Sequence, residues 1–470
     1  MNEDEADKRG DKIHPSKSID INQKLNELPT ELRLRAIDRL KIAKLRKNKK
    51  SVWLSLLLIL SLIGPGMLVM IADNDAGGVI TYAQTGAIFG IGFFIPFMIL
   101  MIPVAYIVQE MTVRLAAVTR RGHAELIWKR YGRFWGAFSL IDLVIANSLT
   151  LVTEFIGITF GMEIFGVPPL YSTIAGVLII SAITLGLRYY KWERASLIIA
   201  AFNLIFVPLV LFAHPNWSIV AKSFTTWAIP GGLTPLFIYV VLANLGTTIA
   251  PWMLFFQQSS EVDKGTVPKD IGSARRDTFI GACVMAAVAI AIIIITGTVV
   301  FGSSIVNKYT DAIGYNIGYI LSTSASKMGY LPVKLFALGI MDAGLIAAIA
   351  ITASTSWAVG EAFGWPKSMN LPFLEGRKFY VPGLLSMLAA AAIVLIPNMP
   401  LGFLNITVQV IASVFMPAAL LFLLLLINDR RLMGKHVNNR WQNASAIIIM
   451  IVLVFMSALY GISIILPHLV

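Results

Sequence analysis

The succession of apolar runs limits the possible fold more than any other feature of this sequence. From residue 52 onward about eleven runs of roughly 20 apolar residues follow one another, and each is long enough to cross about 30 Å of hydrocarbon as a helix. Their approximate extents are 53–90, 91–115, 135–164, 170–188, 193–213, 234–258, 277–302, 333–360, 379–397, 402–427 and 443–466. Hydrophobic residues make up 57% of the chain and charged residues 14%, and a soluble domain this apolar would aggregate. The predicted fold class is therefore an all-α integral membrane protein.

The basic residues between the runs predict the orientation, because short cytosolic connections of membrane proteins are rich in Lys and Arg. These residues gather in alternate connections: Arg120, Arg121, Lys129, Arg130 and Arg133; Arg188, Lys191 and Arg194; Lys264, Lys269, Arg275 and Arg276; Lys367, Arg377 and Lys378; Arg430, Arg431, Lys435 and Arg440. We expect a multi-pass protein of the cell (plasma) membrane with a cytoplasmic amino terminus and an extracellular carboxyl terminus. The net charge of +12 has the same explanation, so no nucleic-acid partner is expected.

The chain is expected to divide into four parts. Residues 1–50 are polar and charged and lack an apolar core followed by a cleavage site, which predicts a cytosolic basic segment rather than a signal peptide. Residues 51–213 would hold helices 1 to 5 and residues 214–428 helices 6 to 10. Residues 429–470 would form a cytosolic loop and helix 11. We expect a monomer whose partners are the lipid bilayer and a transported ion.

The first apolar run is interrupted at its centre by Asp73, Asn74 and Asp75, followed by Gly77 and Gly78. A carboxylate near the middle of a bilayer costs roughly 2.5 to 3.5 kcal/mol on insertion scales, so such residues usually face a cavity, a partner or an ion. Two glycines after the acid give the backbone freedom to leave the helix. A cation is well served by exposed carbonyls next to a carboxylate, so this break predicts a cation site.

A second interruption lies in the sixth run, at residues 246–251, where Pro251 removes a backbone donor. The two breaks are five spans apart, and because that number is odd, the second five-helix unit must cross the membrane in the opposite sense. The sequence thus predicts a 5+5 inverted repeat with helices 1 and 6 broken. The binding site of such a repeat is expected where the broken helices meet.

Several segments in the right order resemble the NRAMP family of divalent-metal transporters, which have the leucine-transporter-type fold. Residues 64–66 and 75–78 resemble its first-helix pattern of Gly-Pro-Gly followed by Asp-Pro-Gly-Asn. Further matches are 115–119 with Glu125, 245–251, and 429–434. The resemblance covers nearly the whole chain from residue 53 and implies a metal-ion transporter with no resident cofactor.

The resemblance also shows where this chain departs from the family. The family's aspartate ligand is kept as Asp75 and its tenth-helix glutamine as Gln409. Its asparagine ligand is Gly78 here and its sixth-helix methionine is Ala250, so an amide oxygen and the soft sulfur ligand are lost. The family's histidine associated with proton movement is Trp252. These differences concern the residues that handle the ion.

The departures favour magnesium. Thioether sulfur prefers softer transition metals, whereas magnesium prefers oxygen ligands and keeps several waters. Gly78 and Ala250 are expected to enlarge the site for a partly hydrated ion, and the pattern resembles the NRAMP-related magnesium transporters. We therefore predict transport of Mg²⁺, and also of Mn²⁺. Thr247 is expected to add a carbonyl or hydroxyl oxygen at the second break.

Other polar residues of the spans are not predicted to be ligands. Asp73, Asn74, Trp252 and Glu154 are placed in the vestibule or behind the ligands. Glu154 could line the outer vestibule or bond a neighbouring helix, and both interpretations stay open. Glu110 should pair with Arg114 one helical turn away. For Asp142 and Asp342 we expect pairing across helices.

Proton coupling is not expected, because no histidine lies near the predicted site. The family also has an acid one turn before Glu154, where this chain has Leu151. Glu154 is the remaining candidate for carrying a proton.

Three other functions remain open. The first is proton-coupled transport of Mn²⁺ or Fe²⁺, as in the main family. The second is a carrier of small organic substrates such as amino acids, although Asp75 would repel a substrate carboxylate. The third is a membrane-embedded enzyme, but the spans contain no histidine pair and only one cysteine, Cys283. We therefore expect a transporter and not an enzyme.

Overall fold

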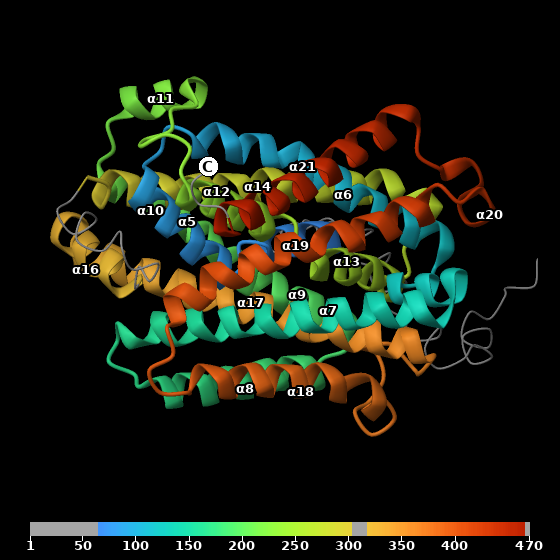
Figure 1. Ribbon diagram of the computed structural model, residues 1–470. Coiled ribbons are helices and arrows are strands. Elements are labelled where there is room, and N and C mark those ends of the chain that lie inside the picture. The colour runs from blue at the N-terminus through green and yellow to red at the C-terminus, as the bar shows by residue number, and fades with distance from the viewer. Residues whose placement is uncertain (1–63, 303–316, 466–470) are drawn as a thin grey trace, which may run out of the picture.

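The computed structural model describes residues 64–302 and 317–465, and every regular element in these ranges is a helix. The elements are α4 (Pro65–Ala72), α5 (Ala76–Phe89), α6 (Phe94–Thr119), α7 (His123–Glu163), α8 (Pro169–Gly186), α9 (Tyr189–Ala201), η1 (Phe202–Ile205), α10 (Phe206–Leu209), η2 (Val210–Ala213), α11 (Trp217–Thr226), α12 (Pro235–Thr248), α13 (Pro251–Lys264), η3 (Pro268–Asp270), α14 (Ile271–Val299), α16 (Ile317–Met328), α17 (Tyr330–Phe363), α18 (Arg377–Val394), α19 (Leu401–Ile427), α20 (Arg430–Met433), η4 (Gly434–His436) and α21 (Arg440–Ile465). The predicted all-α membrane fold is confirmed (Figure 1).

Within the described ranges, ten helical segments are long and apolar enough to cross a membrane. The first expected span, 53–90, is not among these ten, because the break divides it into the short helices α4 and α5. Its residues 53–63 lie outside the described part of the chain, and so does the segment 1–50. The largest difference from the expected spans is at α7, which begins at His123 rather than near residue 135. A helical segment precedes a kink at Gly132, where φ is 85° and favours glycine.

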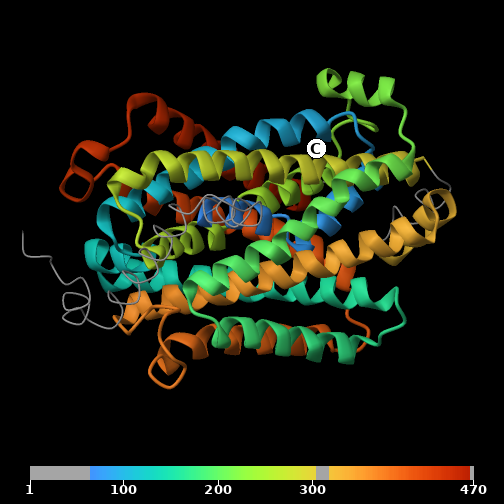
Figure 2. The same cartoon turned by 180° about the vertical axis from the view of Figure 1, so that it is seen from behind.

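The two halves of the repeat pack against each other through corresponding helices. The second helix of each half, α6 and α14, are in contact, and so are the third helices, α7 and α17, and the fourth, α8 and α18. The broken helices α5, α12 and α13 run through the middle of the bundle, while α8 and α18 form its outer layer (Figures 1 and 2). This arrangement places both breaks in the protein interior, where unpaired backbone groups in a membrane protein are tolerated.

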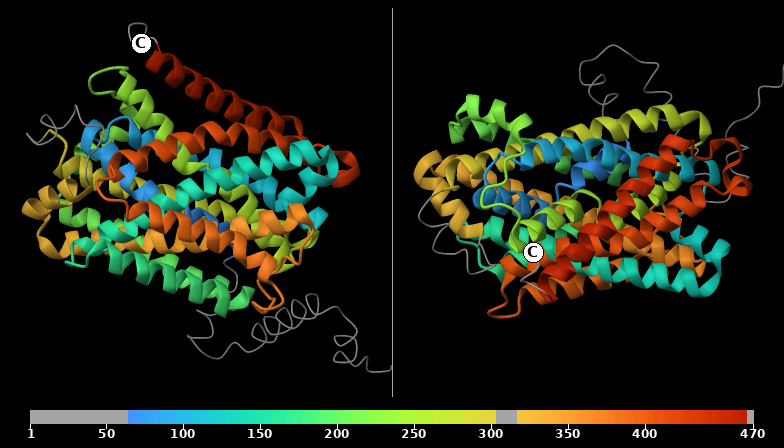
Figure 3. Two further views of the ribbon diagram at one scale, coloured as in Figure 1. Left: turned by 60° about the horizontal axis from the view of Figure 1, so that its bottom comes forward. Right: turned by 45° about the horizontal axis from the view of Figure 1, so that its top comes forward.

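The periphery is apolar and exposed. Helix α21 lies on the outside of the bundle against α12 and α19 (Figure 3). Leu178 on α8, Leu385 on α18 and Ile448 on α21 are among its exposed apolar side chains. A bilayer explains such a surface, because soluble monomers rarely expose large contiguous apolar patches.

The basic connections meet at one end of the bundle, which we call the basic end. Arg130 near the start of α7 is 2.6 Å from Asp429 before α20, and Lys264 at the end of α13 is 2.9 Å from Glu193 on α9. The alternation of basic connections predicted this shared end. Because both pairs bridge different connections, the basic end is held together by contacts remote in sequence.

Helix α4 is fastened to α14 at both of its ends. At its start, the Asp277 carboxylate accepts hydrogen bonds from the N–H groups of Gly64 (2.9 Å) and Met67 (3.0 Å). Just past its end, the Asn74 amide donates to the carbonyl of Met285 at 3.3 Å. The two bonds to Asp277 satisfy donors that the start of a helix leaves without partners. The short first half of the broken helix therefore has a defined position.

Candidate metal-ion site at the two helix breaks

The first break runs from Asp73 to Asp75. Asp75 is extended (φ −66°, ψ 172°) and its carboxylate accepts a hydrogen bond from the N–H of Gly78, so that it caps α5. The positive end of the helix dipole favours a negative charge at this position. The polar Asp-Asn-Asp run and the glycines after it account for both the end of α4 and the start of α5.

The second break consists of Ile249 and Ala250, both in extended conformations, before Pro251 begins α13. Pro251 has no N–H, so the carbonyl of Thr247 lacks the donor that a continuous helix would supply. The hydroxyl of Thr247 also has no hydrogen-bond partner among the described residues, whereas Thr248 bonds the carbonyl of Asn244. Thr247 therefore has two oxygens free at the break, as its predicted role requires.

The two breaks touch at Gly78. A Cβ atom on Gly78 would lie 2.7 Å from the Thr247 methyl group, 3.1 Å from Oδ1 of Asp75 and 3.3 Å from the carbonyl oxygen of Asp73. In this conformation Thr247 and Asp75 fill the space beside Gly78, so the enlargement of the site by Gly78 stays a prediction for a conformation in which the helices separate. The small residue instead lets the two broken helices approach each other.

Gln409 of α19 lies between the two broken helices. A Cβ atom on Gly77 would clash with Nε2 of Gln409 and lie 2.8 Å from the Thr153 hydroxyl, and a Cβ on Gly246 would clash with the Gln409 carbonyl. The side chain is buried, and its Nε2 has no hydrogen-bond partner in the described part of the chain. The structure thus brings Gln409 to the meeting point predicted for it.

Glu154 of α7 bonds the neighbouring broken helix. Its Oε2 accepts from the Ala76 N–H at 2.9 Å, and its Oε1 accepts from the Thr153 hydroxyl at 3.1 Å. In a continuous helix the Ala76 N–H would pair with the carbonyl of Ala72, which is left without that donor. Of the two interpretations kept open for Glu154, the structure shows the bond to a neighbouring helix. The sequence did not point to the Ala72 carbonyl, since only the tertiary contact exposes it.

The acids of the site are buried without a counter-ion. Asp73, Asp75 and Glu154 have exposures of 0%, 2% and 0%. None of them forms an ion pair with a described Lys, Arg or His side chain. Both carboxylate oxygens of Asp73 and the side-chain oxygen of Asn74 also lack hydrogen-bond partners there. Buried charges are strongly unfavourable unless something balances them, so this cluster has the electrostatics of a cation site.

A sulfur atom, that of Met253, lies at the second break although position 250 is an alanine. The Ala250 N–H points to Sδ of Met253 at 3.4 Å, and Met253 is fully buried. The resemblance to the family pointed only to the methionine position that Ala250 occupies in this chain. One turn of α13 brings Met253 back to the break, a proximity that the helical spacing itself could have indicated.

Trp252, at the start of α13, lies among aromatic side chains. Trp252 packs its ring edge-on against Phe256 with centroids 6.0 Å apart, in a cluster with Trp192 and Trp357, and its carbonyl accepts from Ser354. This placement indicates a packing role for Trp252.

The structural acids behave differently from one another. Glu110 pairs with Arg114 at 2.8 Å, as predicted. The pairing expected for Asp142 and Asp342 is wrong for the described residues: neither has an ion pair or hydrogen bond there, and Oδ2 of Asp342 is buried without a partner. Asp142 is only partly buried, so solvent or lipid headgroups can take the place of a protein partner.

A family model described as natural resistance-associated macrophage protein-like matches residues 66–463. The divalent metal cation transporter MntH of Latilactobacillus sakei is 26% identical over 416 residues, covering 85% of this chain and 88% of that protein. MntH 1 of Pseudomonas aeruginosa is 27% identical over 402 residues, covering 82% and 87%.

Solved structures show the same fold. The manganese transporter of Eremococcus coleocola has a TM-score of 0.70 at 21% identity, covering 89% of this chain and 88% of that one. MhsT in complex with L-phenylalanine has a TM-score of 0.54 at 15% identity, with coverages of 85% and 98%. The fold and the paired breaks define a helical membrane transporter of the leucine-transporter type. The chain belongs to the natural resistance-associated macrophage protein (NRAMP) family, whose members are transporters and not enzymes.

Replacing Glu154 tests how the first break is held. Glu154→Gln keeps an acceptor for the Ala76 N–H and should fold normally, whereas Glu154→Leu leaves that buried donor unpaired and should cost about 1 to 3 kcal/mol. Thermal unfolding in detergent would measure the difference. Glu163→Leu, at an exposed position near the end of the same helix, is the control. Equal stability of the Leu and Gln variants would show that this bond does not hold α5.

Proposed function

We propose that the chain transports divalent metal ions, with Mg²⁺ preferred and Mn²⁺ also carried. The observation that supports it best is the buried cluster of Asp73, Asp75 and Glu154 at the helix breaks, which has no counter-ion among the described residues. The names of the relatives, divalent metal cation transporters, agree with a cation as the substrate. The proposal includes a monomer in the plasma membrane with its amino terminus in the cytoplasm and its carboxyl terminus outside. It also includes repeat boundaries near residues 213 and 428.

Asp75 is the principal charged ligand in this proposal. The carbonyls of Ala72 and Thr247, both without their helical donors, and the side chain of Gln409 complete the oxygen set around it. Gly78 and Ala250 contribute by their backbone and small size. Among the described residues, no group of three His, Cys, Asp or Glu side chains is placed to hold a metal. A site with so few protein ligands suits an ion that retains water, as magnesium does.

The site is closed in this conformation, since its ligands are at most 3% exposed. A partly hydrated ion therefore needs one side of the site to open. The contact of Gly78 with Thr247 joins the two broken helices, so separating them would both admit the ion and create the room that its waters need.

A second candidate function is transport of Mn²⁺ or Fe²⁺. The sulfur of Met253 near Ala250 favours it, because a thioether is a ligand for softer ions. The manganese transporter of Eremococcus coleocola has the same fold. In the magnesium proposal, Met253 accepts the Ala250 N–H and takes no part in binding the ion.

Replacing Asp75 tests the proposed site. Asp75→Ala in proteoliposomes should bind and move divalent metal at least about tenfold less well, because a charged ligand contributes about 1.5 kcal/mol or more. Calorimetry and a metal-sensitive dye measure the two effects. Asp142→Ala removes an acid outside the site and should retain transport. Normal transport by Asp75→Ala would refute the assignment.

Uptake is expected to proceed without proton movement. Leu151 and Trp252, which replace titratable groups of the family, are buried and cannot carry a proton. A pH-sensitive dye inside the vesicles should show no acidification when metal enters. If acidification accompanied metal entry and disappeared in Glu154→Gln, the transport would be proton-coupled through Glu154.

Two substitutions at the second break test selectivity. Met253→Leu removes the sulfur with little change in volume, and we expect the ratio of Mg²⁺ to Mn²⁺ transport to stay the same. Ala250→Met adds a thioether and bulk, which should lower Mg²⁺ relative to Mn²⁺ transport. Competition uptake gives the ratios, with thermal unfolding as a check on folding. A selective loss of Mn²⁺ transport in Met253→Leu would favour the second candidate function.

A further inference from the structure

A pocket with both polar and apolar lining residues lies apart from the proposed metal site, between α6, α14 and α21 at the basic end. Its volume is about 240 Å³, and Tyr106, Ile107, Glu110, Met111, Arg275 and Gln442 line it. A water molecule occupies about 30 Å³ in the liquid, so the pocket has room for a larger polar group. None of these residues takes part in the proposed metal binding.

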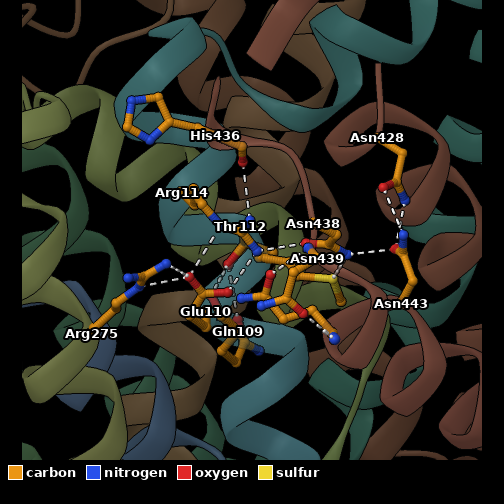
Figure 4. Close-up of polar contacts among 12 residues, drawn as sticks. Gln109, Glu110, Thr112, Arg114, Arg275, Asn428, His436, Asn438, Asn439 and Asn443 are labelled. Carbon is orange, nitrogen blue, oxygen red and sulfur yellow. Dashed lines mark hydrogen bonds and ion pairs between the residues drawn. The ribbon is translucent and has the colours of Figure 1, made fainter. Parts of the chain in front are cut away.

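Two guanidinium groups share one carboxylate in this pocket. Arg114 lies 2.8 Å from Oε2 of Glu110, and Arg275 lies 2.6 Å from Oε1 (Figure 4). Arg114 is buried, and its other donors bond the carbonyl of His436 at 3.0 Å and Oδ1 of Asn438 at 2.6 Å. The charges of Arg114, Arg275 and Glu110 therefore add up to one positive charge that this carboxylate does not balance.

That surplus charge belongs to the accessible partner, Arg275. Its side chain is 40% exposed, and its Nη1 makes no hydrogen bond to any described residue. The hydroxyl of Tyr106 likewise has no partner in the described ranges. A guanidinium with free donors presents a fork that matches two oxygens of a phosphate.

The surroundings of the pocket combine an apolar wall with an interfacial rim. Phe279, one turn after Arg275, is 49% exposed and packs edge-on against Tyr106 with centroids 5.5 Å apart. Trp441, beside Gln442 at the start of α21, is 82% exposed, as Trp often is at a membrane interface. Further along α21, Ile448 and Ile451 are exposed apolar residues that acyl chains can cover.

We propose that this pocket binds the headgroup phosphate of an anionic phospholipid. Arg275 pairs with the phosphate, Tyr106 and Gln442 donate to its oxygens, and the acyl chains follow the apolar surface of α14 and α21. A metal cation is a poor occupant because the cluster of Arg114, Glu110 and Arg275 has a net positive charge and Arg275 faces the pocket. A lipid is favoured over a soluble phosphate because the pocket opens beside exposed apolar helix faces. Basic pockets between membrane helices are suited to such headgroups.

Arg275→Gln tests the proposal, with Arg276→Gln as its matched control. Arg276 is the next residue, is exposed, and bonds only the carbonyl of Gly272 on its own helix at 3.3 Å. The delipidated full chain in detergent would be titrated with phosphatidylglycerol or phosphatidylcholine and followed by native mass spectrometry and thermal unfolding. Phosphatidylglycerol should bind the parent and Arg276→Gln at least about fivefold more tightly than Arg275→Gln. Glu110 keeps Arg114 as its partner in both variants.

A second variant separates the pocket from general surface charge. Ile107→Trp fills the pocket without changing any charge and should also lose the preference for phosphatidylglycerol. The proposal is overturned if Arg275→Gln and Ile107→Trp, both folded, bind this lipid as the parent does. It is overturned equally if Arg276→Gln loses binding as much as Arg275→Gln. Displacement of the lipid by millimolar inorganic phosphate would overturn the lipid assignment in favour of a soluble anion.

Discussion

The structure depends on how backbone groups freed by two broken helices are satisfied inside a membrane. No water is available there to hydrogen-bond an open N–H, so each break needs partners from neighbouring helices. Glu154 supplies one for Ala76, Asp75 supplies one for Gly78, and Asp277 supplies one for the start of α4. Donors are therefore satisfied by acids, whereas the carbonyls of Ala72 and Thr247 lack the donors of a continuous helix. In the proposed function these carbonyls bind the cation, so one arrangement would both hold the helices and bind an ion.

Close approach of the helices is the second requirement of the site. Gly77 and Gly246 allow Gln409 to lie between the broken helices, and Gly78 allows Thr247 to reach the first break. Small side chains at these positions thus serve helix packing first. In the proposed transport of a partly hydrated ion, the extra room comes from movement of the helices, which links the size of the site to its opening.

The alanine at position 250 does not by itself remove sulfur from the second break. Ala250 removes the family's thioether from the break, but Met253 brings another sulfur to the Ala250 N–H. In the proposed transport of magnesium, the preference for a hard ion depends on which way that sulfur points when the site opens. Away from the site, Arg114 and Arg275 share the single carboxylate of Glu110, so this cluster has one surplus positive charge beside the lipid-facing surface. The metal site lacks positive charge, and this pocket has a surplus.

The sequence by itself determined the helical membrane fold, the two breaks, the inverted repeat and the Glu110–Arg114 pair. Hydrophobic length, helix-breaking residues and spacing along one helix are local properties that can be read without coordinates. It did not determine the contact at Gly78, the bond from Glu154 to Ala76 or the lack of partners for Asp142 and Asp342. Those depend on which residues of different helices face each other. Helix rotation and separation are set by the packing of the whole bundle, so only the tertiary structure could decide them.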